Sequence, residues 1–200
     1  MRQRWLLVAL LCCLLSDAQA GKQKEEALAD SVRVALSRAI TDPRPPRLSF
    51  ADDGDRDEWH RWSAAMSARL QSRMPDAMVR AEFLQTVWYE ARRAGLEPSL
   101  VLGLIQVESG FRKYAISTAG ARGYMQVMPF WTRVIGDGDV RALFDMRTNL
   151  RYGCVILRHY LERERGNLFM ALGRYNGSRG KAAYPDAVLA AQRAWVYADA

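Results

Sequence analysis

The chain has 200 residues, of which 50% are hydrophobic and 26% charged, and its 29 Lys and Arg residues outnumber its 22 Asp and Glu residues to give a net charge of +7. This composition suits one folded domain with a hydrophobic core and excludes a chain that is disordered throughout. Two His and three Cys residues supply little material for a metal site, so we expect no metal and no cofactor.

The first twenty residues have the features of a secretory signal peptide. Arg2 and Arg4 precede an apolar run over residues 5–15, and Ala-Gln-Ala follows at 18–20. A cationic start, a short apolar stretch and small residues at −3 and −1 predict cleavage after Ala20. The apolar run is too short to span a bilayer as a stable anchor. We therefore expect a periplasmic or secreted protein.

Residues 21–75 are predicted to form an N-terminal extension. Residues 21–40 are charged and rich in Ala, which indicates a loose helix, and residues 42–47 hold three Pro residues, which is typical of an extended linker. Residues 59–70 then repeat large apolar side chains, two of them Trp, at helical spacing. This pattern predicts a helix that docks on the rest of the protein through its Trp pair. We expect the extension to be dispensable for the chemistry.

From Asp76 onward, chain-breaking residues separate segments with helical spacing. The first predicted helix stops at Gly95, a natural C-cap, and the second begins at Pro98 and runs to Glu108. Further helices are expected over residues 125–135, 149–165, 168–175 and 185–197. No segment alternates with period two, and no hairpin dipeptide joins two apolar runs. The sequence therefore predicts an all-α protein with a single core.

Glu108 is out of place for a charged side chain. It ends the most apolar of these segments, three residues after Ile105 and four after Leu104, so it lies on the apolar stripe of the helix. Burial disfavours an ionised carboxylate, and a neutral carboxyl can donate a proton near neutral pH, as a general acid does. The alternative is that Glu108 closes the helix and reaches solvent past Gly110.

The segment after Glu108 offers no second carboxylate. Residues 109–136 contain no Asp or Glu, yet they hold three Arg residues and one Lys. Glycosidases with acid catalysis commonly use a second carboxylate, about 5–5.5 Å away in retaining enzymes and farther away in inverting ones. A distant residue such as Asp145 could supply it. If none does, the substrate itself must provide the nucleophile.

Three ordered blocks resemble the soluble lytic transglycosylases. They are Glu108-Ser109-Gly110-Phe111, the run A-G-A-R-G-Y-M-Q-V-M-P at 119–129, and Arg174-Tyr175-Asn176-Gly177. The family pattern is E-S-x-F, then G-A-x-G-L-M-Q-x-M-P, then a Y-N pair, and the likeness covers about residues 76–195. It implies a lysozyme-like helical domain with a substrate cleft, which we assign to residues 76–200 as the catalytic domain.

The resemblance also implies an activity that needs one carboxylate. The family cleaves the β-1,4 bond between N-acetylmuramic acid and N-acetylglucosamine in peptidoglycan. Glu108 would protonate the glycosidic oxygen while the muramic N-acetyl group stabilises the developing positive charge. Glu108 would then take the proton of the muramic C6 hydroxyl, which closes on C1 to give a 1,6-anhydro sugar.

By the same likeness, six further residues take substrate-binding roles: Ser109, Met125, Gln126, Tyr175, Asn176 and Tyr184. Ser109 would orient the carboxyl of Glu108, Met125 would line the cleft, and Gln126 would bond acetamido groups. The Tyr-Asn pair would contact the sugar and the catalytic carboxyl, and the last tyrosine is matched by position alone. The alternatives are a helix-terminal hydroxyl for Ser109, a core position for Met125 and a solvated helical side chain for Gln126.

The sequence departs from the family pattern at several positions. Tyr124 stands where the family prefers Leu, and Lys113-Tyr114 replaces the usual Asn-Pro. Phe130-Trp131 follows the motif where small residues and Thr are commoner. These changes bear on the preference for parts of the substrate rather than on the reaction.

The positive charge suits an anionic partner. Peptidoglycan stem peptides carry free carboxylates, so a basic protein would concentrate on the wall. We expect no nucleic-acid partner because no recognition-helix or zinc signature is present. We expect a monomer that acts on glycan strands, with an envelope-spanning secretion or appendage machine as a candidate partner. Two other functions stay open, a lysozyme-type hydrolase that uses Glu108 with a distant Asp and a non-catalytic wall-binding module.

Overall fold

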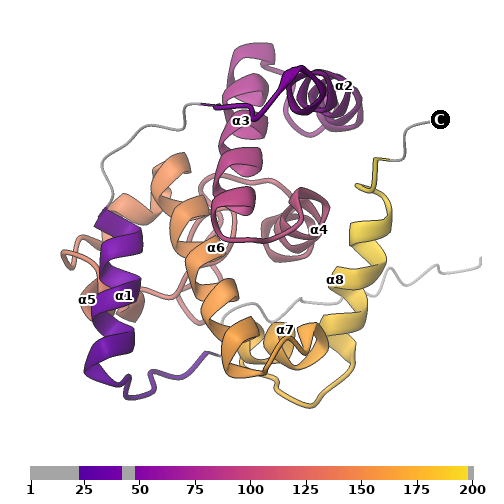
Figure 1. Cartoon of the computed structure of the whole chain (residues 1–200). Helices are drawn as coiled ribbons and strands as arrows, with labels where there is room; N and C mark the ends of the chain where they lie inside the picture. The colour runs from indigo at the N-terminus through magenta and orange to yellow at the C-terminus, as the bar shows by residue number, and fades with distance from the viewer. Residues whose placement is uncertain (1–22, 42–47, 198–200) are drawn as a thin grey trace, which may run out of the picture.

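The structure is a computed structural model that describes residues 23–41 and 48–197. Its elements are α1 (Asp30–Thr41), α2 (Asp53–Leu70), α3 (Ala77–Arg93), α4 (Pro98–Ser109), α5 (Phe130–Ile135), the 3-10 helix η1 (Val140–Phe144), α6 (Met146–Arg163), α7 (Leu168–Asn176) and α8 (Ala183–Arg193) (Figure 1). Within these residues, β pairing is limited to two isolated bridges in the segment 116–127. The all-α prediction is confirmed. The predicted signal peptide and Pro-rich linker lie outside the described residues.

Helix α4 lies near the middle of the molecule and packs against α3 and α8 (Figure 1). It begins at Pro98, as predicted, and ends at Gly110, whose φ of +57° suits a glycine. A Cβ on Gly103 would lie 2.7 Å from the backbone nitrogen of Gln192, so the crossing with α8 requires a residue without a side chain. This close crossing brings α8 onto the helix that carries Glu108.

Helix α2 packs on α3 through a cluster of three tryptophans. The ring centroids of Trp59 and Trp62 are 5.6 Å apart, and that of Trp88 on α3 lies 5.5 Å and 4.9 Å from them. Further along α2, Met66 and Leu70 are fully buried in the same hydrophobic core as α3 and α4. The predicted helix and its packing through the Trp pair are therefore confirmed.

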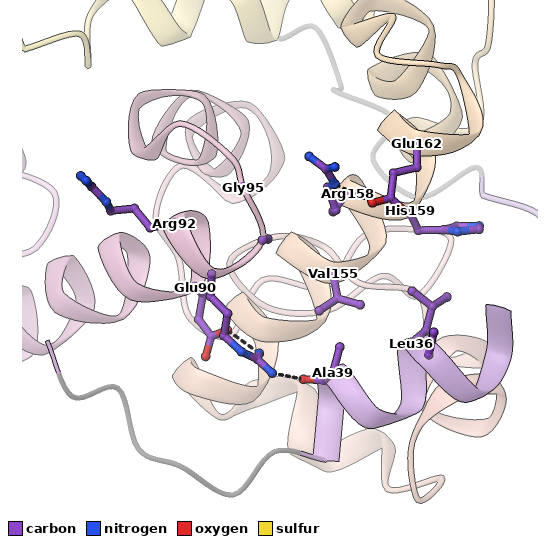
Figure 2. A pocket seen from close by; sticks show the side chains of 12 residues that line it. Leu36, Ala39, Glu90, Arg92, Gly95, Val155, Arg158, His159 and Glu162 are labelled. Carbon is purple, nitrogen blue, oxygen red and sulfur yellow. Dashed lines mark hydrogen bonds and ion pairs between the residues drawn. The ribbon is translucent and has the colours of Figure 1, made fainter. Parts of the chain in front are cut away.

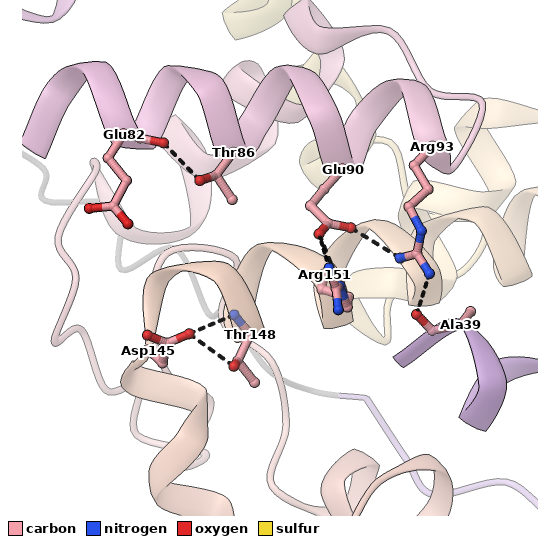
Figure 3. A network of polar contacts seen from close by, with 8 residues as sticks. All are labelled: Ala39, Glu82, Thr86, Glu90, Arg93, Asp145, Thr148 and Arg151. Carbon is pink, nitrogen blue, oxygen red and sulfur yellow. Dashed lines mark hydrogen bonds and ion pairs between the residues drawn. The ribbon is translucent and has the colours of Figure 1, made fainter. Parts of the chain in front are cut away.

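A buried carboxylate joins three helices. Glu90 of α3 is 1% exposed and forms ion pairs with Arg93 at 3.3 Å and with Arg151 of α6 at 2.8 Å (Figure 3). Arg93 also donates to the carbonyl oxygen of Ala39 in α1 at 2.7 Å. A shift of α3 relative to α6 would separate Glu90 from Arg151 and leave a buried charge without its partner, which is costly. The network therefore holds α3 and α6 together.

The prediction of a helix over residues 125–135 is wrong for its first half. The helix α5 begins only at Phe130, and Gln126 has a φ of +49°, which a right-handed helix does not allow. Residues 122 and 127 pair instead as an antiparallel bridge. The apolar spacing of this segment reflects burial in a turn that distant side chains hold in place.

The last helix is shorter than predicted. Helix α8 ends at Arg193, although residues 185–197 keep helical spacing. Trp195 lies beyond it, is 2% exposed and donates from its indole nitrogen to Oε1 of Gln106 in α4 at 2.9 Å. Its burial against α4 accounts for the apolar signal after the helix. None of the helices in the described part of the chain is long and apolar enough to span a membrane.

Candidate active site

Glu108 lies in the last turn of α4 and is buried, as its spacing predicts. Its side chain is 8% exposed, and Oε1 accepts a hydrogen bond of 2.5 Å from the hydroxyl of Tyr184 in α8. Oε2 is buried and has no hydrogen-bond partner among the described residues. Burial raises the pKa of Glu108 to about 8, against a smaller lowering by Tyr184. The carboxyl is therefore mostly protonated at neutral pH and can act as a general acid.

Two tyrosines accompany this carboxyl. The pKa values of Tyr175 and Tyr184 are raised well above the usual range, first by burial and then by the nearby charge of Glu108. Both hydroxyls therefore stay protonated and serve as hydrogen-bond donors. Tyr184 donates to Glu108, and Tyr175 donates to the carbonyl oxygen of Met125 at 2.7 Å. The structure thus brings together side chains from α4, α7 and α8.

The turn at residues 122–126, which we call the motif turn, is fixed by Asn149. The Oδ1 of this buried side chain accepts from the backbone N–H of Met125 at 2.8 Å, and its Nδ2 donates to the carbonyl oxygens of Arg122 and Leu143, each at 2.8 Å. A Cβ on Gly123, whose φ is +77°, would lie 2.3 Å from that Nδ2. The position of Asn149 therefore requires a residue without a side chain at position 123 of the motif. This role could not be predicted from the sequence because an Asn in the first turn of a helix usually acts locally.

Gln126 and Met125 support the motif turn from inside. Gln126 is 3% exposed, and its Nε2 donates to the carbonyl oxygens of Ala115 at 3.1 Å and Gly123 at 2.9 Å. The side chain of Met125 has no exposed surface and packs on Gly153 of α6, where a Cβ would lie 2.2 Å from the Met125 sulfur. Gln126 is therefore not a solvated helical side chain, whereas Met125 has the core position that was its alternative. Their contacts with a substrate stay predictions.

Ser109 and Asn176 are buried, and neither bonds to Glu108. The hydroxyl of Ser109 donates one turn back to the carbonyl oxygen of Ile105 at 3.2 Å, which is the helix-terminal role. Asn176 donates from Nδ2 to the hydroxyl of Ser178 at 2.9 Å, while its Oδ1 is buried without a partner. A buried acceptor without a donor is costly, so the unpaired oxygens of Glu108 and Asn176 are places where ligand hydroxyl or amide groups can bind.

Among the residues that the structure describes, no second carboxylate acts on the pKa of Glu108. Burial and Tyr184 are the two influences on its pKa, and neither is an acidic group. Asp145, the distant candidate, is exposed and caps α6 by accepting from the backbone N–H and the hydroxyl of Thr148, each at 2.9 Å (Figure 3). Within the described residues, no three His, Cys, Asp or Glu side chains gather in a way that could hold a metal ion.

A separate cavity of about 510 Å³ lies away from Glu108, between α1, the end of α3 and α6 (Figure 2). Glu90, Arg158, His159 and Glu162 are among its lining residues. Its acidic groups are paired, Glu90 as described above and Glu162 with Arg158 at 2.8 Å. Because both of these carboxylates are held by Arg residues and the residues of the three motif blocks lie elsewhere, we take the Glu108 site as the candidate active site.

The family described as the transglycosylase SLT domain matches residues 85–188, which include Glu108, the motif turn and Tyr184. The membrane-bound lytic murein transglycosylase C of Actinobacillus pleuropneumoniae serotype 5b is 54% identical over 48 residues, which cover 24% of this chain and 13% of that protein. The protein of the same name from Haemophilus influenzae strain PittEE is 33% identical over 114 residues, which cover 50% of this chain and 32% of that protein. The chain thus matches less than a third of the length of these relatives.

A solved structure, the lytic transglycosylase Slt of Pseudomonas aeruginosa, is similar at 20% sequence identity and a TM-score of 0.46. The similarity covers 86% of this chain and 35% of that one.

Proposed function

Because the chain belongs to the transglycosylase SLT domain family, we propose that it is a peptidoglycan lytic transglycosylase that uses Glu108 as its single general acid and base. The observation that carries this proposal is the buried, mostly neutral carboxyl of Glu108, which has no carboxylate partner within residues 23–41 and 48–197. A lysozyme-type hydrolase commonly uses a second carboxylate, and the described residues that act on the pKa of Glu108 include none. The relatives named above are described as murein transglycosylases, which supports the same substrate class.

The hydrogen bond from Tyr184 assigns the acidic proton to one oxygen. Because the hydroxyl donates to Oε1, the proton of the neutral acid belongs on Oε2, which has no partner among the described residues. Oε2 would pass this proton to the glycosidic oxygen as the bond from that oxygen to C1 of the muramic residue breaks. The negative charge left on Glu108 is stabilised by the hydrogen bond from Tyr184.

The second half of the reaction reverses the flow of the proton. The acetamido group of the muramic residue would stabilise the positive charge on C1. The Glu108 carboxylate would then remove the proton of the C6 hydroxyl, and the C6 oxygen would form the new bond to C1. The proton count of Glu108 returns to its starting value, and no water is consumed.

The location and partners follow from the same proposal. The relatives are named membrane-bound, which supports a place in the cell envelope, and the signal peptide predicted to end at Ala20 provides a route there. The protein would act as a monomer on glycan strands. Substrate groups with free hydroxyl or amide donors would bond to the unpaired Oδ1 of Asn176.

Mass spectrometry of the sugars released from purified peptidoglycan tests the proposal. We expect 1,6-anhydromuramic products, which are one water lighter than hydrolysed ones. Glu108→Gln should abolish the release of sugars. Glu97→Gln changes an exposed carboxylate at the start of the same helix and should leave the release unaltered. Reducing-end muramic products would identify a hydrolase instead. Binding to the wall without release would identify a non-catalytic module.

A further inference from the structure

Residues Gln23–Thr41, which we call the N-terminal strap, lie across the part of the molecule opposite α2. Helix α1 packs against α5 and α6, which is visible at the lower left of Figure 1. The residues before α1 reach further, because Glu26 pairs with Arg163 of α6 at 2.6 Å and with Arg174 of α7 at 3.6 Å. The strap therefore spans three helices of the domain that carries Glu108.

Most of the strap is held loosely. No residue of α1 is buried, and a cavity of about 510 Å³ lies between α1 and α6 (Figure 2). A second cavity of about 460 Å³ is lined by residues 27–36 of the strap and by α6. The pair of Glu25 with Arg133 at 3.4 Å has both side chains more than half exposed. Exposed ion pairs of this kind contribute little to stability. Apart from the bond from Arg93 to the carbonyl oxygen of Ala39, a firm attachment of the strap requires a buried contact.

Gln23 supplies that contact. Its side chain is 7% exposed, and its Oε1 accepts from the indole nitrogen of Trp131 in α5 at 2.8 Å. Its Nε2 donates to the backbone carbonyl oxygen of Tyr175 in α7. The two partners are 3% and 2% exposed. A side-chain amide offers a donor and an acceptor on one planar group, so the single side chain of Gln23 joins α5 and α7.

The carbonyl that Gln23 bonds belongs to a helix end. The last carbonyls of an α-helix lack partners within the helix. In α7, the carbonyl of Gly173 is paired with the N–H of Ser178 at 2.7 Å, and that of Arg174 with the N–H of Gly177 at 3.0 Å. Gln23 provides the donor for Tyr175, so the strap completes the capping of the turn that holds the Tyr-Asn pair.

This turn is close to the candidate active site. The hydroxyl of Tyr175 fixes the motif turn through the carbonyl of Met125, and the charge of Glu108 contributes to the raised pKa of Tyr175. The next residue, Asn176, presents a buried oxygen without a partner. A shift of the last turn of α7 would therefore move the hydroxyl of Tyr175, which holds the motif turn, and the unpaired oxygen of Asn176.

We propose that Gln23 is a positioning residue for the reaction at Glu108. It does not contact Glu108 but holds the last turn of α7 in place by joining it to Trp131 of α5. This inference rests on the proposed function. It makes the N-terminal strap part of the active unit, in contrast to the expectation that residues 21–75 are dispensable for the chemistry. It also gives Trp131, where the family pattern has smaller residues, a role specific to this chain.

The test compares Gln23→Ala, Trp131→Phe and the double variant in the full chain. Trp131→Phe keeps an aromatic ring but removes the N–H donor, and Glu25→Gln is the matched control because it removes only an exposed pair of the strap. The readouts are kcat and KM for anhydro-sugar release, and the NMR titration midpoint of the Glu108 carboxyl carbon. The second readout does not depend on turnover.

We expect Gln23→Ala to lower kcat by about tenfold with KM within about twofold, because small misplacement of a positioned group affects the chemical step more than binding. The Glu108 midpoint should move as well, Trp131→Phe should act in the same direction, and the double variant should lose less than the product of the single losses. The control should match the unmodified chain.

A folded Gln23→Ala protein with unchanged kcat and unchanged Glu108 midpoint would overturn the proposal, even if its melting temperature falls, because Gln23 would then act on stability alone. If Gln23→Ala does not fold, Trp131→Phe is decided by the same two readouts. If the unmodified chain releases no anhydro sugar, the proposed function fails, and the Glu108 midpoint still decides the role of Gln23.

Discussion

The hydroxyl of Tyr184 in α8 lies 2.5 Å from Oε1 of Glu108 at the end of α4, so the acid and its hydrogen-bond donor come from the two helices that cross at Gly103. Because this crossing leaves no space for a Cβ, the geometry of the site depends on how closely the backbones approach. The same bond leaves Oε2 as the oxygen that carries the proton.

We predict that activity falls as pH rises through the pKa of Glu108, at about 8, because the first step needs the protonated acid. Tyr184 lowers this pKa by stabilising the charged form, so Tyr184→Phe should move the falling limb of the pH–rate profile to higher pH and also lower kcat. The profile is measured as kcat/KM against pH. Tyr197→Phe, at a tyrosine outside the site, is the control and should leave the limb in place. If the falling limb of Tyr184→Phe stayed at the pH of the unmodified chain, Tyr184 would have no influence on the pKa of Glu108.

We predict that Glu108 makes the folded protein less stable as pH rises. Its pKa is about 8 in the folded state against 4.5 in a model peptide, so the folded state binds more protons than the unfolded state between these values. The free energy of unfolding must then decrease with pH across this window, by on the order of 5 kcal/mol in total. Below about pH 4.5 the group is neutral in both states and has no such effect.

Glu108→Gln should remove this dependence. The variant should be more stable than the unmodified chain above pH 8, with the difference shrinking toward pH 4.5. Urea unfolding at several pH values measures it, with Glu97→Gln as the exposed control. Parallel curves for Glu108→Gln and the unmodified chain would show that Glu108 is not buried as a neutral acid.

Much of the site could be predicted because its signals are local. Glu108 lies on an apolar helical stripe, and the structure buries it. The residues that support it could not be predicted in the same way. The left-handed turn at Gln126 depends on Asn149, which is 23 residues away from it, and the fixing of Tyr175 depends on Gln23, which is 152 residues away. Periodicity reports burial but does not distinguish a buried turn from a buried helix.

We predict that Gly103→Ala destabilises the protein and weakens the site. The new Cβ would lie 2.7 Å and 2.8 Å from backbone atoms of Gln192, which cannot rotate away, so α8 must shift. We expect a loss of about 1–3 kcal/mol of stability, as for other overpacked cores, and a fall in kcat because α8 carries Tyr184. Gly54→Ala is the control, since its Cβ would meet only the side chain of Asp52. Equal melting temperatures for both variants would contradict the tight crossing.

We predict that Asn149 is needed for the motif turn. Asn149→Asp keeps an acceptor for the N–H of Met125 but replaces the donor to the carbonyl oxygens of Arg122 and Leu143 with a second acceptor. The buried carbonyl of Leu143 then loses its partner, while that of Arg122 keeps only the backbone N–H of Val127 at 3.0 Å. One unsatisfied buried carbonyl costs about 1–3 kcal/mol, so the free energy of unfolding should fall by about this amount.

The same substitution should reduce kcat, because the carbonyl of Met125 also receives the hydroxyl of Tyr175 and the turn would no longer hold that contact. Arg147→Ala is the matched control, because Arg147 lies two residues before Asn149 in α6 and forms an exposed ion pair with Glu82 of α3. It should change the free energy of unfolding by less than about 1 kcal/mol. If Asn149→Asp lost stability but kept full kcat, the motif turn would support the fold without setting the geometry at Glu108.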